Sequence, residues 1–274
     1  MSTVDADSAP ESRSHPHYGD IVVVGGGCYG GYYVRQLRRA RAAGALTWQR
    51  LLVVDRDADC AVARAEAEHS STDPADAITL VVRDWSLFFG GYLSAAAARG
   101  ADAVAADAIV PSPLMPHLMS HWLVSRARER WPGRGIRMAP TLDGALDVPW
   151  QRGGDDGSHY VSFAAWECPI NCVEPVKCPH TRGIRAWSLP PTVRTFVATE
   201  RLRGRRLDGP AVFHCAHRAY GVGMFDVAAV VHADTLVAQA ADGRAAEVLV
   251  GTVSHCHGAL AVLELAAPAH DSSR

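Results

Sequence analysis

A glycine-rich turn near the start of the chain follows an apolar run and leads directly into a helix-like segment. Residues 20–24 read Asp-Ile-Val-Val-Val, a β-branched run that suits a buried strand. Three glycines at G-x-G-x-x-G spacing come next: Gly25, Gly27 and Gly30. Residues 32–43 look helical, and a second apolar run at 51–54 ends in Asp55. This order predicts a strand–turn–helix–strand unit with two parallel strands.

Each glycine in the turn has a separate role. Gly25 permits the tight turn out of the strand, Gly27 lets a pyrophosphate approach the backbone, and Gly30 lets the helix pack close to the sheet. The helix then directs its unpaired N–H groups and its positive dipole end toward the phosphates. Asp55 is positioned to accept hydrogen bonds from a ribose 2′-hydroxyl, which favours NAD(H) or the adenosine half of FAD over NADP(H). Arg56 softens that preference because arginine can pair with a 2′-phosphate.

These residues resemble the Rossmann dinucleotide-binding superfamily over about residues 20–140, without identifying one family. The resemblance implies a doubly wound parallel sheet that binds NAD, or alternatively FAD, beyond the carboxyl ends of its strands. It implies a cofactor-binding role for four residues: Gly25, Gly27, Gly30 and Asp55. Cys28 lies inside the turn where cofactor or substrate would pass, so it is either a reactive thiol or a small residue that fills the turn.

Strand-like and helix-like segments alternate through the rest of the first half. We expect strands at 77–82, 107–111 and 135–140, and helices at 87–99 and 117–130. Such alternation is typical of a parallel, doubly wound sheet with right-handed crossovers.

The pattern changes after about Leu142. Residues 151–158 look like a linker or hairpin tip, followed by strands at 160–166 and 211–216, a helix at 223–240 and a hairpin at 248–265 that turns near Gly258. The predicted fold is therefore α/β, a Rossmann-like doubly wound parallel sheet followed by a smaller α+β domain. The expected divisions are a disordered N-terminus at 1–19, a dinucleotide-binding domain at 20–141 and an accessory or substrate domain at 142–274.

Composition limits the partners. The 274 residues are 48% hydrophobic and 20% charged, and their formal net charge of −2 creates no field that attracts nucleic acid or a membrane. No apolar stretch approaches the ~20 residues that span a bilayer, and the N-terminus has no apolar signal core. We expect a cytoplasmic protein with a small-molecule substrate, and a homo-oligomer is left open. Seven cysteines in that compartment indicate metal or thiol chemistry rather than disulfides.

A cysteine–histidine loop is the second notable feature. Residues 168–180 contain Cys168, Cys172, Cys178 and His180, and three prolines that disfavour a helix. Such a loop can hold zinc with four ligands, or an iron–sulfur cluster with three cysteines and a ligand from elsewhere, although the spacing C-x3-C-x5-C departs from the usual cluster patterns. The alternatives are a redox or catalytic thiol, for example a Cys168–Cys172 disulfide, and inert buried cysteines.

Three histidines further along are candidates for a catalytic base or a fourth metal ligand: His217, His255 and His257. An unperturbed pKa of ~6.5 suits histidine to both roles, although a histidine at a strand end is often a hydrogen-bonded structural residue.

The leading functional hypothesis is an NAD(H)-binding oxidoreductase that acts on a small molecule, with a metal site in the second domain as a further expectation. A histidine would act as acid or base, or a bound metal would polarise a substrate oxygen. One alternative is a flavin or iron–sulfur electron-transfer protein. The other is a non-catalytic sensor of nucleotide, redox state or metal.

Overall fold

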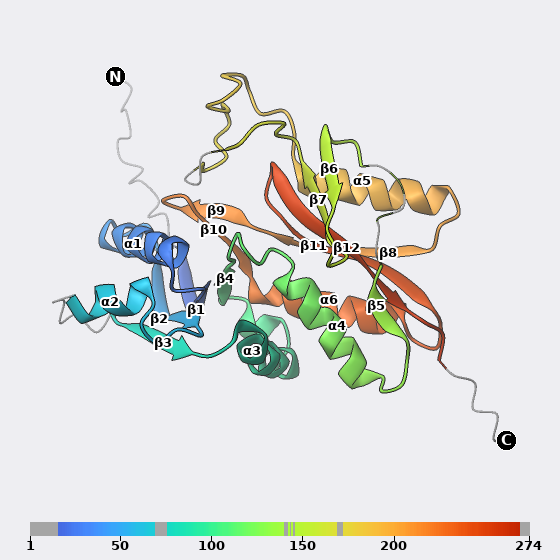
Figure 1. The fold of residues 1–274 in the computed structure, drawn as a ribbon, viewed down its shortest axis with the longest axis horizontal. Coiled ribbons are helices and arrows are strands. Elements are labelled where there is room, and N and C mark those ends of the chain that lie inside the picture. The colour runs from blue at the N-terminus through green and yellow to red at the C-terminus, as the bar shows by residue number, and fades with distance from the viewer. Residues whose placement is uncertain are drawn as a thin grey trace, which may run out of the picture.

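A computed structural model of the protein describes residues 16–68, 76–139, 142, 144, 146–168 and 172–268. The described residues form a mixed α/β structure with two six-stranded sheets and helices packed around them (Figure 1). Within these ranges, no helix combines the length and the apolar composition needed to cross a lipid bilayer.

The first sheet has the strand order β3-β2-β1-β4-β10-β9. Its first four strands pair in parallel, and the helices α1 to α4 alternate with them along the chain. The strands are β1 (His17–Val24), β2 (Thr47–Asp55), β3 (Ile78–Val82) and β4 (Ala108–Val110). The helices are α1 (Cys28–Ala42), α2 (Ala61–Glu68), α3 (Trp85–Arg99) and α4 (Leu118–Arg130). β1 begins at His17, inside the range expected to be a disordered lead-in, and residues 1–15 lie outside the described residues.

Two strands from the second half of the chain complete the first sheet. β10 (Val222–Asp226) pairs antiparallel with β4, and β9 (Ala216–Ala219) pairs antiparallel with β10. The prediction of a helix from Gly223 was therefore wrong for its first residues, because α6 (Val227–Ala240) begins only after β10. Met224 and Phe225 pack into cores on opposite faces of the sheet, as successive residues of a strand do.

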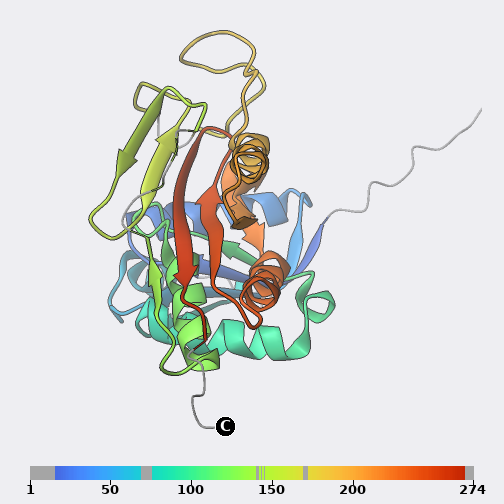
Figure 2. The ribbon, with the colours of Figure 1, turned by 90° about the vertical axis from the view of Figure 1, so that its right-hand side faces the viewer.

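The second sheet has the order β6-β7-β12-β11-β8, and β5 also pairs with β12. Its strands are β5 (Ile136–Met138), β6 (Trp150–Gly153), β7 (His159–Ser162), β8 (Leu207–His214), β11 (Ala246–Val253) and β12 (His257–Leu265). Figure 2 shows the long β11–β12 hairpin in red beside the yellow-green β6–β7 hairpin. The expectation that residues 135–140 extend the first sheet was wrong, since β5 pairs antiparallel with β12.

The largest core lies between the two sheets. Val22 and Val24 of β1 join it from the first sheet, Val248 and Leu263 join it from the second, and α3, α4 and α6 fill the space between. α5 (Leu189–Leu202) packs on the other face of the second sheet through a separate apolar cluster. The first sheet thus takes β9 and β10 from beyond residue 142, and the second sheet takes β5 from before it.

Candidate functional site

A cavity of about 470 Å³ lies at the carboxyl ends of β1 and β2, against the first turn of α1. All four residues predicted to bind the cofactor line it, together with Cys28: Gly25, Gly27, Gly30 and Asp55. The rest of the wall comes from the segments that follow β2, β3 and β4, and includes Arg56, Asp84, Trp85 and Ser112.

The three glycines differ in what surrounds them. Gly25 has a φ of 89°, a left-handed conformation that favours glycine, and its N–H donates to the carbonyl of Val54 at 2.8 Å. A Cβ atom on Gly30 would overlap the carbonyl oxygen of Gly25, so the helix can approach the turn only if residue 30 has no side chain. A Cβ atom on Gly27 would meet nothing within 4 Å, and Gly27 lines the cavity.

Asp55 holds the glycine turn from the end of β2. Its Oδ2 accepts a hydrogen bond from the Gly26 N–H at 2.6 Å, and its Oδ1 accepts one from the Asp57 N–H at 2.9 Å. A carboxylate oxygen has two acceptor positions, so each oxygen can accept a second hydrogen bond from a ligand hydroxyl.

A second cavity, of about 330 Å³, lies between the two sheets. His217 and His257 line it, together with Tyr33 and Cys215. Ser112, in the segment after β4, lines both this cavity and the one at the glycine turn, so both cavities adjoin this residue.

His257 is oriented by a hydroxyl group. Its Nδ1 lies 2.9 Å from Ser162 Oγ, and that hydroxyl donates to the carbonyl of Ala164 at 2.9 Å. We therefore assign the proton to Nδ1 of His257, which leaves Nε2 as the basic atom. Desolvation by the surrounding protein lowers the pKa of His257, although the residue is exposed at the cavity mouth.

Glu174 is the residue that connects the cysteine–histidine loop to the histidines, and no role was predicted for it. Its buried carboxylate accepts hydrogen bonds from Ser254 Oγ at 2.6 Å and from the backbone N–H groups of His255 and Cys256, each at 2.9 Å. His217 Nδ1 lies 3.8 Å from the same carboxylate. The only sequence signal for Glu174 was an acidic residue in an apolar, proline-rich segment.

The charge on Glu174 affects the groups around it. Burial alone would raise its pKa, but the hydrogen bonds from Ser254, His255 and Cys256 lower the pKa of Glu174 below its ordinary value. Burial lowers the pKa of His217, and Glu174 opposes part of that effect. Glu174 is therefore ionised at neutral pH, and it faces His217, whose surroundings favour the neutral imidazole.

His255 differs from the other two candidate histidines. Its Nδ1 lies 2.8 Å from Ser188 Oγ, and its ring packs edge-on against His214 with centroids 4.8 Å apart. It is not among the residues that line the second cavity. His255 therefore does not share the second cavity with His217 and His257, and its role as a catalytic base stays a prediction.

The predicted metal ligands lie in one loop but not around one point. Burial and the nearby Cys172 raise the pKa of the Cys168 thiol, whereas the backbone N–H of Thr181 lowers the pKa of Cys178. The His180 ring stacks on Trp166 with centroids 4.5 Å apart. Among the described residues, no three of Cys168, Cys172, Cys178 and His180 bring their ligand atoms within 4.8 Å of one another. Metal binding by this loop stays a prediction.

The cysteines near the two cavities are expected to differ in reactivity. Cys28 is exposed, whereas burial raises the pKa of Cys215 to about 12. At pH 8 a thiol with that pKa is ionised in a fraction on the order of 10⁻⁴, and the thiolate is the nucleophile. We expect iodoacetamide to modify Cys28 at least about a hundredfold faster than Cys215, as measured by peptide mass spectrometry. Equal labelling rates in the folded protein would contradict the raised pKa of Cys215.

Comparison with protein families gives a match over the second half of the chain. A family described as "Uncharacterized protein, C-terminal domain" matches residues 119–266, from α4 to the end of the second sheet. No curated protein and no solved structure matches the chain. The matched region contains Glu174, His217 and His257, whereas the glycine turn lies outside it. Because the match covers more than half of the 274 residues, the chain belongs to this family.

Proposed function

We propose that the chain is an NAD(H)-binding oxidoreductase that acts on a small molecule. The observation that carries this proposal is the cavity built by Gly25, Gly27, Gly30 and Asp55 at the start of α1. Each of the three glycines has the surroundings that its role in dinucleotide binding requires, and the backbone N–H groups at the helix start suit a pyrophosphate.

The strand order supports a Rossmann-like, doubly wound arrangement for this part of the chain. The parallel strands run β3-β2-β1-β4, so the order reverses between β1 and β4. Ligands of open α/β sheets bind at such a reversal, beyond the carboxyl ends of the strands. The helices lie on both faces, because α1 packs on the core that includes Ile21 and α3 packs on the core that includes Val22.

The second cavity supports oxidoreductase chemistry. Bound NAD(H) would accept or supply a hydride, and a substrate alcohol or carbonyl needs a partner that takes or gives the accompanying proton. His257 fits that role through Nε2, because Ser162 fixes its other nitrogen and its lowered pKa favours the neutral base. His217 is the second candidate, since it lines the same cavity and faces the carboxylate of Glu174.

Gly27→Ala tests the nucleotide site with little effect on the fold. The new methyl group would enter the cavity without touching protein, and residue 27 has a φ of −72° that alanine adopts easily. The added methyl group would keep a pyrophosphate away from the backbone of the glycine turn. The loss of one hydrogen bond to a charged group corresponds to roughly tenfold to a hundredfold weaker NADH binding in a fluorescence titration.

Gly91→Ala is the matched control, because Gly91 lies in α3 and a Cβ atom there also meets nothing within 4 Å. It should bind NADH like the wild type. Equal affinities in all three proteins, or no thermal shift with NAD(H), NADP(H) or FAD, would refute the proposal. A purified protein with a flavin or iron–sulfur spectrum would favour the electron-transfer alternative, and NADH affinity without turnover on any alcohol or carbonyl tested would favour the sensor.

A further inference from the structure

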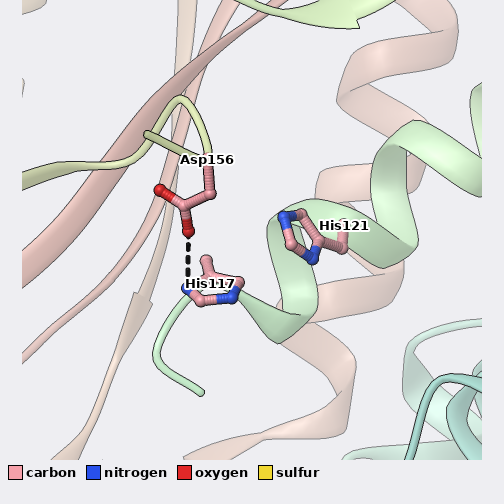
Figure 3. Close-up of side chains that lie close together, drawn as sticks. All are labelled: His117, His121 and Asp156. Carbon is pink, nitrogen blue, oxygen red and sulfur yellow. Dashed lines mark ion pairs between the residues drawn. The ribbon is translucent and has the colours of Figure 1, made fainter. Parts of the chain in front are cut away.

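Two histidines and an aspartate from distant parts of the chain converge at the start of α4. His117 occupies the N-cap position of α4 and His121 lies one helical turn later, so both rings lie on the same face of the helix. Asp156 reaches them from the turn between β6 and β7 (Figure 3). The ligand atoms of these three residues all lie within 4.8 Å of one another.

The spacing matches that of ligands around a small divalent cation. His117 Nδ1 lies 3.2 Å from Asp156 Oδ2, and the two histidine rings have centroids 4.5 Å apart. Two ligands of a tetrahedral zinc ion, each bonded at about 2.0–2.1 Å, are separated by roughly 3.3 Å. The observed separation of this nitrogen and this oxygen therefore fits two ligands of one metal ion.

A simple hydrogen bond between His117 and Asp156 does not account for the arrangement. His117 Nδ1 is buried, and in spite of the 3.2 Å separation it has no hydrogen-bond partner of good geometry among the described residues. A buried ring nitrogen of this kind lacks the stabilisation that native structures normally provide. A cation between the nitrogen and the carboxylate would supply it.

The carboxylate is held in place by a second layer of contacts. The Ser158 N–H donates to Asp156 Oδ1 at 3.0 Å, and Ser158 Oγ donates to Oδ2 at 3.1 Å. Metal-binding carboxylates are commonly oriented by such hydrogen bonds. His121 also lines a cavity of about 360 Å³ between α3 and α4, which provides room for a water molecule or another ligand beside the site.

We propose that His117, His121 and Asp156 form a binding site for a divalent transition-metal ion of the zinc class. Two imidazoles and one carboxylate are ligands that Zn²⁺ prefers, and three protein ligands leave a fourth position open. The ion would also fasten the β6–β7 turn to the start of α4. This site is separate from the cysteine–histidine loop and does not depend on nucleotide binding.

Zinc titration of the full chain, treated first with a chelator, tests the site by calorimetry. His121→Gln and Asp156→Asn should each lose one equivalent of bound zinc, or bind it at least about a hundredfold more weakly. The wild type should also gain roughly 5 °C in Tm at a hundredfold excess of zinc over Kd. Asp155→Asn removes the neighbouring charge and His232→Gln removes an exposed helical histidine, so both controls should bind zinc like the wild type.

Cobalt substitution distinguishes this site from one made by cysteines. A site with two histidines and one aspartate gives visible d–d bands that disappear in Asp156→Asn, without a thiolate charge-transfer band. Equal zinc affinity in Asp155→Asn and Asp156→Asn, with unchanged circular dichroism, would overturn the proposal. So would a cobalt spectrum that shows only thiolate bands.

Discussion

Gly30→Ala is expected to destabilise the protein by about 3 kcal/mol, at the upper end of the usual cost of overpacking. The new Cβ atom would overlap the carbonyl oxygen of Gly25. That oxygen belongs to the backbone of the turn and cannot rotate away. The start of α1 would therefore have to shift away from the turn and the sheet. In a chain of this size we expect a fall in Tm of roughly 6–12 °C, measured by circular dichroism.

Gly31→Ala is the matched control for this prediction. Gly31 is the next residue of α1, and the nearest atom to its added Cβ is the end of the flexible Arg35 side chain, at 3.5 Å. Alanine is favoured over glycine inside a helix by roughly 0.5–1 kcal/mol, so this variant should be as stable as the wild type or slightly more so. If the two variants had the same Tm, the result would contradict the close contact between Gly30 of α1 and the carbonyl oxygen of Gly25.

The glycine turn could be predicted from the sequence because its geometry is local. Gly25 and Gly30 are five residues apart, and the contact between them requires only that a helix follow a strand directly. The position of Asp55 could also be predicted, because a βαβ unit brings the end of its second strand beside the end of its first. Spacing therefore indicated which residues of the first strand–helix–strand unit would line one cavity.

The second cavity depends on contacts between residues far apart in the chain. β9 and β10 join the first sheet after a crossing from the second, and only that crossing brings His217 near Glu174. The sequence contains no periodic pattern that specifies such a pairing. His117 and His121 have helical spacing that is visible in the sequence. Asp156 comes from the segment predicted as a linker or hairpin tip, which is the turn between β6 and β7, and nothing in the sequence placed that turn beside α4.

α5 is a helix that we did not predict, for a different reason. Pro190 and Pro191 both lie in its first turn, where a missing N–H costs little because the N–H groups of that turn have no partner within the helix. Ser188 occupies the N-cap position and contacts His255 instead of capping the helix. The serine hydroxyl that would normally cap the helix therefore makes a tertiary contact with His255 instead.

Glu174→Gln should destabilise the protein by about 3 kcal/mol. Both carboxylate oxygens of Glu174 accept hydrogen bonds from buried or half-buried donors, and an amide would direct its NH₂ group at one of them. A buried donor left without an acceptor costs about 1–3 kcal/mol, and the lost charge weakens the remaining bonds.

Glu167→Gln is the control, because it removes a carboxylate from the same region at an exposed position, and its effect should stay within about 0.5 kcal/mol. Urea unfolding of the three proteins measures the difference. A Glu174→Gln protein as stable as the control would show that the carboxylate does not anchor the loop to the turn between β11 and β12.

The effect of Glu174 should also depend on pH in a defined direction. The pKa of Glu174 lies below its ordinary value of 4.5 in the folded protein, so folding favours the ionised form. Its contribution to the free energy of unfolding is fully present above about pH 4.5 and decreases as the pH falls through the folded pKa. The stability difference between wild type and Glu174→Gln should therefore be constant from pH 6 to 8 and become smaller under more acidic conditions. If the difference instead grew as the pH fell, folding would favour the protonated carboxyl group, which would contradict an ionised Glu174 that accepts hydrogen bonds from the turn between β11 and β12.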